Sequence, residues 1–262
     1  MKKTLIALAV AASAAVSGSA MAWTANGNGG NVDLGGTLTP QDVLTPWEVK
    51  VGDAVSGLDA DIRKGDTAVS ITVNKAIPVL GIRVVDTTPF VGRAGISPQI
   101  DFNGAVDVKG FSAGVSTLTL DVTDTDGNNI GTMSAPFLAA AGFSRTGNNN
   151  GAYSSYVYSG YDVSSFTGGL GASSSAVLPN LTTVISRLNA IDSEFSANFD
   201  QQNQSDGGAW RSTPFENVND VYNGFYGSGI EQGEAITITL NSPAGADAID
   251  WKASLPVTVS YL

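Results

Sequence analysis

Short stretches of alternating apolar and polar residues recur from Trp47 to the C-terminus. Such alternation is typical of a strand with one face on a core and the other in water. The clearest stretches are WEVKV (47–51), VSITV (69–73), VSTLTLDV (115–122), AITITL (235–240) and LPVTVSYL (255–262). PVLGIRVV (78–85) and IDFNGAVDV (100–108) are less regular. Many short strands separated by Gly, Asp, Asn and Pro predict a mainly all-β fold, an antiparallel sandwich or barrel.

One short segment between two of these stretches predicts a hairpin turn. DTDGNN (124–129) contains Asp126-Gly127, a pair that supplies the positive φ angles of a tight turn. The same segment resembles part of a calcium loop. In the EF-hand register, however, Val122 would be the first ligand and Met133 would stand at the twelfth position, so we expect a turn.

The composition changes between about residues 142 and 229, where Gly, Asn, Ser and Tyr become frequent. We interpret this region as an elaboration inserted into the sandwich, with long loops of the kind that carry function. It contains TTVISRLNAIDSEFSANF (182–199), preceded by Pro179 and Asn180, which can start a helix. Its apolar residues have helical spacing, which predicts one amphipathic α-helix: Val184, Ile185, Leu188, Ile191 and Phe195.

Residues 1–22 have the pattern of a signal peptide. Lys2 and Lys3 precede an apolar run from Leu5 to Val16, and Ala20-Met21-Ala22 forms a cleavage site. We expect the mature chain to begin at Trp23. The apolar run is shorter than the roughly 20 residues that a membrane-spanning helix needs. The sequence therefore predicts an exported protein without a membrane anchor.

The charge and the missing residue types exclude several classes of function. The chain has 24 acidic and 13 basic residues, and a net charge of −11, so it is repelled by nucleic acid and by anionic membranes. It has no histidine and no cysteine, the residues that supply the commonest general base, transition-metal ligands and thiol nucleophile. We therefore predict no enzyme, no metal and no cofactor. A carboxylate-dependent glycosidase stays an alternative, although no spacing singles out a pair of acids.

GFSAG (110–114) matches the nucleophile-elbow pattern G-x-S-x-G. The chain has no histidine to activate Ser112, and no helical pattern follows the pentapeptide. We therefore expect a turn there rather than a catalytic serine.

Aromatic residues gather in the inserted region, at Tyr153, Tyr156, Tyr158, Tyr161 and Phe166, with Trp210 and Arg211 further along. Aromatic rings pack well against sugar rings, so the four tyrosines, Trp210 and Arg211 are candidates for binding a receptor. Cross-strand packing is the alternative for each tyrosine.

Both ends of the mature chain have strand patterns. Near the start, NVDLGGTLTP places Val32, Leu34, Gly36 and Leu38 on one face. Such an extended segment can add itself to the open edge of another sheet. At the end, Leu255, Val257, Val259 and Tyr261 share one face, and the chain stops one residue later. The pattern alone allows equally that each end pairs within its own domain.

Seven segments carry a resemblance to a known family: the leader, NVDLGGTLTP, WEVKVG, DGNNIGTMSAPF, the ISRLNAI region, YGSGIEQGEAITITLN and the final LPVTVSYL. Together they resemble the fimbrial major and minor subunit family of enterotoxigenic enteric bacteria. The resemblance covers most of the chain, is strongest at its ends and is weak in the inserted region. It implies an incomplete immunoglobulin-like sandwich of the chaperone–usher class, divided into a signal peptide (1–22), an N-terminal donor strand (23–40) and a pilin sandwich (41–262).

The resemblance also implies the partners. A periplasmic chaperone fills the gap left by the missing strand, and an outer-membrane usher replaces it with the extension of another subunit. The donor face would be Val32, Leu34, Gly36 and Leu38, and Tyr261 would match the aromatic residue that the chaperone contacts. The resemblance places the protein in a fimbrium on the cell surface, where such subunits also bind host glycoconjugates. A stand-alone exported carbohydrate-binding module is the alternative.

Overall fold

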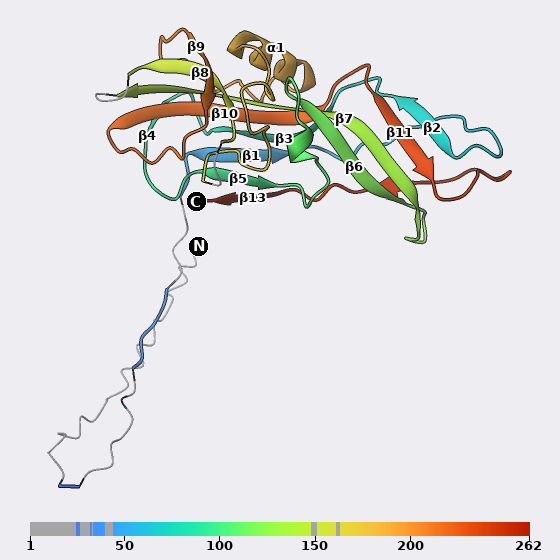
Figure 1. The fold of residues 1–262 in the computed structure, drawn as a ribbon, viewed down its shortest axis with the longest axis horizontal. Helices are drawn as coiled ribbons and strands as arrows, with labels where there is room; N and C mark the ends of the chain where they lie inside the picture. The colour runs from blue at the N-terminus through green and yellow to red at the C-terminus, as the bar shows by residue number, and fades with distance from the viewer. Residues whose placement is uncertain (1–24, 27–31, 33, 40–43, 148–150, 161–162) are drawn as a thin grey trace, which may run out of the picture. The chain divides into compact units, whose positions relative to one another are not determined.

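The computed structural model describes residues 25–26, 32, 34–39, 44–147, 151–160 and 163–262. The predicted signal peptide, 1–22, lies outside these residues, as does Tyr161. The chain forms two units, residues 1–41 and 42–262. Residues 34–39 of the first unit have no secondary structure, whereas the second unit is an all-β sandwich with open sheets and one short α-helix (Figure 1).

The main sheet is built around two long strands, β7 (Asn129–Gly147) and β10 (Asp220–Ile230), which pair antiparallel. Its central path runs β1-β3-β10-β7-β11-β2. The other strands on this path are β1 (Trp47–Val51), β3 (Ile77–Val84), β11 (Ala235–Leu240) and β2 (Ala68–Thr72). Part of the predicted insertion, 142–229, therefore lies inside the two central strands of the sheet.

Shorter strands extend this sheet at several points. β6 (Val115–Thr123) pairs with β7 and with β12 (Lys252–Ala253), and β4 (Phe90–Val91) pairs with β10. β8 (Tyr153–Tyr158) pairs antiparallel with β7 and parallel with β9 (Asp206–Arg211). A second, two-stranded sheet joins β5 (Pro98–Asp101) to β13 (Thr258–Tyr261).

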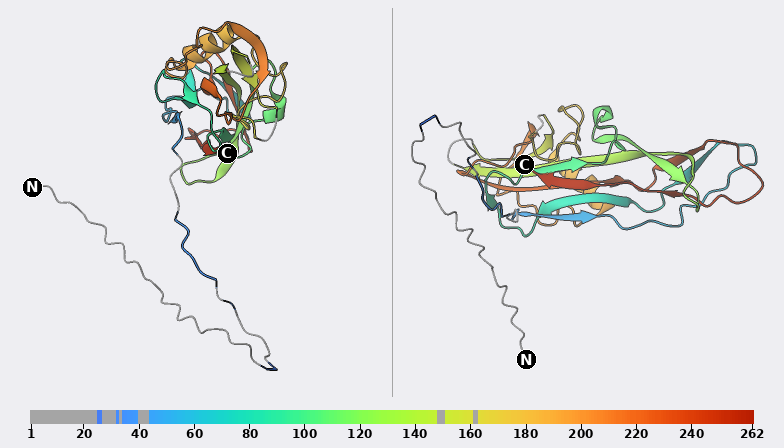
Figure 2. Two further views of the ribbon diagram at one scale, coloured as in Figure 1. Left: turned by 90° about the vertical axis from the view of Figure 1, so that its left-hand side faces the viewer. Right: turned by 90° about the horizontal axis from the view of Figure 1, so that it is seen from below.

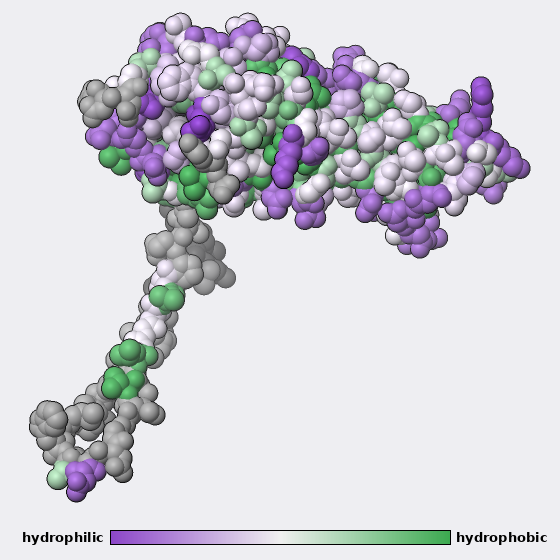
Figure 3. Space-filling model, viewed as in Figure 1, coloured by the Kyte–Doolittle hydropathy of each residue, from purple (hydrophilic) through white to green (hydrophobic). Residues whose placement is uncertain are grey.

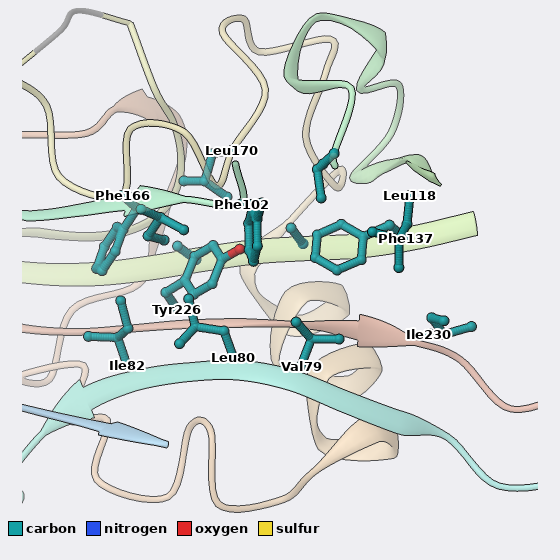
Figure 4. Packing of buried hydrophobic residues seen from close by; sticks show 14 of the residues in the cluster. Val79, Leu80, Ile82, Phe102, Leu118, Phe137, Phe166, Leu170, Tyr226 and Ile230 are labelled. Carbon is teal, nitrogen blue, oxygen red and sulfur yellow. The ribbon is translucent and has the colours of Figure 1, made fainter. Parts of the chain in front are cut away.

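The long strand β7 is buried on both faces because it separates two apolar clusters. Phe137 and Phe143 belong to the main core, whereas Leu138 and Ala140 pack in a second cluster with the helix α1 (Leu181–Ile191). Figures 1 and 2 show α1 on the outer side of β7 and β10, away from β13. The main core contains rings and aliphatic side chains from both sheets and their connections (Figure 4).

The helix confirms the predicted start but is shorter than the predicted segment 182–199. The Asn180 side chain accepts a hydrogen bond from the backbone N–H of Thr183 at 2.8 Å, which caps the first turn. The helix ends at Ile191. Phe195 lies beyond it but is still buried, with its ring over Gly81 and Gly227. A Cβ at either glycine would lie 2.5 Å from that ring, so the packing requires glycine there.

Two predicted turns are present, and one of them differs in detail. Residues 124–128 connect β6 to β7, but only Gly127 has a positive φ angle, 87°; the prediction of a positive φ for Asp126 was wrong. The Asp124 carboxylate holds this turn by accepting from the backbone N–H of Asp126 and of Asn128. Ser112 lies in a tight turn before β6, with positive φ angles at Ala113 and Gly114. The 3-10 turn η1 (Val108–Gly110) replaces the end of the predicted strand 100–108.

Candidate strand-acceptor groove

Residues 244–255 and Val257, which lead into the last strand, form one wall of a groove. Leu255, Val257, Val259 and Tyr261 are partly buried against the main core, and the residues between them are exposed, which confirms the predicted alternation. Only 258–261 of the predicted strand 255–262 pair as β13. Among the described residues, β12 pairs with β6 alone and β13 with β5 alone, so each keeps one backbone edge without a strand neighbour. A free edge of this kind can accept another strand.

The opposite wall begins at β1, which pairs only with β3 among the described strands. Val49 and Val51 point to the core side of the sheet but are 41% and 56% exposed, because no strand covers them. After Val51, residues 52–63 contain no helix or strand. Gly52 allows the backbone to pass close to β3 at this point, since a Cβ there would lie 1.9 Å from the Pro78 carbonyl oxygen.

Between these walls lies a groove of about 1030 Å³. Its walls are residues 51–62 and 244–255, and its floor is apolar. The floor comes from five different strands of the sandwich, at Ile71, Val79, Leu118, Met133 and Ile236. A cavity that opens onto the core between two strand edges has the position and the apolar lining of a missing strand.

The rim of the groove is acidic. One wall contributes Asp53, Asp59 and Asp61, and the other contributes Asp247 and Asp250, with Lys252 as the one basic residue among the described lining residues. Like charges on a rim disfavour partners of the same sign. The groove is therefore suited to an apolar segment with few acidic residues.

The N-terminal segment contains such side chains, and they are uncovered. Val32, Leu34 and Leu38 are 78%, 92% and 97% exposed, and nothing lies within 4 Å of a Cβ placed at Gly36. Apolar patches of this segment are visible in Figure 3. Three large aliphatic side chains are therefore exposed within the seven residues 32–38.

A second candidate site lies in the inserted region, where two rings stack. The rings of Tyr153 and Trp210 lie 4.5 Å apart at 18°, brought together by the parallel pairing of β8 and β9. The Arg145 guanidinium lies 5.3 Å from the centre of the Tyr153 ring, and Arg145 Nε is 3.2 Å from the buried Asp220 carboxylate. Burial raises the pKa of the Tyr153 hydroxyl. Trp210 is 46% exposed, so it presents a flat apolar face to solvent.

The other predicted aromatic residues do not join this surface equally. Tyr156 is partly buried beside the helix cluster, and Tyr158 is also partly buried. Phe166, which the sequence groups with these aromatic residues, is fully buried in the main core against Tyr226. Arg211 is exposed and neighbours Gly160.

Arg145 was missed by the sequence analysis. Its contact with Asp220 joins residues 75 positions apart, and no local pattern reports a pair at that separation. Within the described ranges, no group of three or more acidic residues is placed to hold a metal ion, and no helix has the length and apolarity to cross a membrane.

Comparisons with known proteins identify the family of this chain. A family model described as "Fimbrial, major and minor subunit" matches residues 1–262. The chain is 31% identical over 287 residues to K88 fimbrial protein AB and 30% identical over 285 residues to K88 fimbrial protein AC, both of Escherichia coli. It is 27% identical over 293 residues to the F41 fimbrial protein of the same species, and each alignment covers 100% of both chains. This chain is a member of the fimbrial major and minor subunit family.

Proposed function

We propose that this chain is a structural subunit of a bacterial surface fimbrium and that it polymerises by donor-strand exchange. In this proposal Val32, Leu34, Gly36 and Leu38 of one copy fill the groove of another copy. The observation that carries the proposal is the groove between residues 51–62 and 244–255, which opens onto the core beside two unpaired strand edges.

The energetics favour such an exchange. Burying three aliphatic side chains contributes about 5–9 kcal/mol in total, at roughly 1.5–3 kcal/mol each. Backbone hydrogen bonds to the free edges of β1 and β13 would add to this, and ordering the segment would subtract from it. Gly36 suits a narrow point of the floor, where the donor backbone has to approach closely.

The open groove also implies a partner before assembly. An apolar floor beside unpaired edges is prone to aggregate when it is left uncovered. We propose that a periplasmic chaperone covers the groove and the β13 edge near Tyr261, and that an outer-membrane usher replaces it with the next donor strand. This route places the subunit on the cell surface after passage through the periplasm.

Adhesion is a second proposed function, and the exposed face of Trp210 favours it. A tryptophan stacked on Tyr153 is held in one orientation, so a sugar ring can pack on its free face at a low entropic cost. Arg145 and Arg211 would place hydrogen-bond donors nearby, with Tyr156 and Tyr158 at the margin. The proposed ligand is a host glycoconjugate.

The donor-strand proposal is tested by adding a peptide of residues 23–40 to a chain that begins at residue 41. We expect the peptide to raise the melting temperature by more than 10 °C, since several kcal/mol of burial shift Tm by this amount in a domain of this size. A matched peptide with Leu34 and Leu38 replaced by Asp should have no effect. An equal or absent shift with both peptides would contradict the proposal.

A further inference from the structure

Exposed apolar side chains gather at the end of the sandwich where the chain leads into β1. Within the described part of residues 42–262, seven large apolar side chains are more than half exposed, and six of them lie at this end. We call these six the basal patch: Leu44, Val85, Val91, Val163, Val218 and Leu262. The seventh is Val51, which borders the groove.

Hydrogen bonds tie individual members of the basal patch to residues at this end of the sandwich. The Arg93 guanidinium donates to the Leu44 carbonyl, and the Arg93 N–H donates to the Phe215 carbonyl at 2.9 Å. Leu262 exchanges two backbone hydrogen bonds with Ser97, whose hydroxyl also donates to the Val163 carbonyl at 3.2 Å.

The remaining members are tied to the same end. The Val85 N–H donates to the Pro46 carbonyl at 3.0 Å, two residues from Leu44. Gly92, next to Val91, packs so closely on the turn before β10 that a Cβ would lie 2.3 Å from the Asn217 carbonyl oxygen. Val218 is the next residue of that turn.

Val218 is held at the tip of a fixed turn. The Asn217 side chain donates to the Asp220 carboxylate at 2.8 Å and accepts from the Asn219 N–H at 3.1 Å, and the Asp220 N–H donates to the Asn217 carbonyl. Val218 is nevertheless 66% exposed. An apolar side chain on a preorganised turn loses little entropy when a partner covers it, as is typical of an anchor residue in an interface.

The length of the linker identifies the partner. Five residues separate Leu38, the last residue of the proposed donor face, from Leu44. A fully extended chain covers at most about 20–22 Å over these six steps. If Leu38 lies in a neighbour's groove, the neighbour's body begins within that distance of Leu44. The surface around Leu44 must then face the neighbour.

From this arrangement we propose that the basal patch is a second contact between consecutive subunits and that a second copy of this chain covers it. The inference rests on the proposed donor-strand exchange. The donor strand and its linker connect the two subunits flexibly. Contact through the basal patch would fix the angle between them. Bivalent contact of this kind increases the stability of a joint beyond that of the strand alone.

The absence of cysteine from the chain allows a direct test. Val218→Cys in the full chain, labelled with benzophenone maleimide and assembled into polymers, should form cross-links to the neighbouring subunit on irradiation. Thr119→Cys, exposed on β6 and outside the basal patch, is the matched control and should form at least tenfold fewer. Mass spectrometry of the cross-linked peptides identifies the partner.

The outcomes separate the two proposals. The basal contact is overturned if residue 218 cross-links no better than residue 119, or if residue 218 cross-links to a different protein. Either result leaves donor-strand exchange standing. A wild-type chain that forms no polymers overturns both. In an independent measurement, Val218→Asp should break polymers about tenfold faster on heating, because about 1.4 kcal/mol of lost burial corresponds to that factor. Its stability as a monomer should stay unchanged.

Discussion

Val51 lies directly opposite Leu80 in the β1–β3 pair, and the two side chains share the core face of the sheet, yet Leu80 is fully buried and Val51 is 56% exposed. Cross-strand partners normally have similar surroundings. The difference arises because β3 has β10 as its second neighbour, whereas β1 has none among the described strands. Val51 therefore lies on an open strand edge, which the proposed donor strand would cover.

The exposure of Val51 gives a direct probe of groove occupancy. We expect Val51→Cys to react rapidly with a thiol reagent in a chain that begins at residue 41. Addition of the 23–40 peptide should slow the reaction at least tenfold, because the peptide covers this edge. Val218→Cys is the matched control, since the peptide alone does not cover the basal patch, and its rate should not change. Equal slowing of both thiols would indicate general tightening rather than strand insertion.

The donor segment should be sensitive on one face only. Leu34→Asp in the 23–40 peptide removes one buried aliphatic side chain and places a charge on an apolar floor, so we expect its affinity to fall at least a hundredfold, about 3 kcal/mol. Thr37→Ser lies on the other face of the strand and should change affinity less than threefold. Isothermal titration measures both. Similar losses from the two substitutions would argue against an alternating donor face.

The alternating pattern predicted the strands that have one exposed face, and it failed for those buried on both. β6 and β11 agree closely with the predicted stretches because Thr119 faces solvent between buried neighbours and Thr239 faces solvent beside the buried Ile238. In β7, Phe137 faces the main core while Leu138 faces the helix cluster, so the sequence there has no period of two. This is why the predicted insertion, 142–229, included the end of β7 and nearly all of β10.

The groove was predictable only in part. The apolar face from Leu255 to Tyr261 and the donor pattern from Val32 to Leu38 are visible in the sequence. The second wall is not, because residues 52–62 have no periodic pattern and become a wall only through the position of β1. The stack of Tyr153 on Trp210 depends on a parallel strand pair between distant segments, which local sequence does not specify.

The proposed adhesion depends on one ring more than on the whole region. We expect Trp210→Ala to abolish binding to host-cell glycoconjugates while polymers form normally, since Trp210 is 46% exposed and its removal leaves no buried cavity. Tyr158→Phe is a milder control that keeps the ring. Binding to a glycan array and polymer yield are measured together. Deleting the surrounding segment would be less informative, because Phe166 and Leu170 belong to the core. Binding that survives Trp210→Ala would assign the stack to packing alone.

A surface charge cluster should make the stability of the fold depend on pH. Lys50 Nζ lies 2.7 Å from carboxylate oxygens of both Asp192 and Glu194. Burial acts to raise the pKa of Asp192, but the hydrogen bonds from Lys50 and from the Glu194 N–H outweigh it, so the pKa lies below its usual value of 3.8. A lowered folded-state pKa stabilises the fold above the unfolded-state value and loses this effect as the pH falls through the folded-state value.

We therefore expect wild-type protein to be more stable than Asp192→Asn at pH 6, and the difference to shrink as the pH falls below 3.8 and through the lower folded-state pKa. Melting temperatures measured from pH 2.5 to 7 give the comparison. Lys50→Met supplies the control, because in its background Asp192→Asn should have a much smaller effect at every pH. A difference that persists undiminished at pH 2.5 would contradict the role assigned to this carboxylate.

The contact between Gly227 and Phe195 provides a test of how the helix region is held on the sheet. A Cβ at Gly227 would lie 2.5 Å from the Phe195 ring and 3.0 Å from a Leu188 methyl group, and both side chains are buried. Gly227→Ala should therefore lower the free energy of unfolding by about 1–3 kcal/mol, the usual cost of overpacking a core. Ser174→Ala is the control, since Ser174 is exposed and lies outside the groove, and it should be neutral. Urea denaturation of peptide-completed protein measures both.

If Phe195 is the cause, Gly227→Ala combined with Phe195→Leu should cost less than the sum of the two single substitutions. Strict additivity would show that the ring does not limit the space at Gly227.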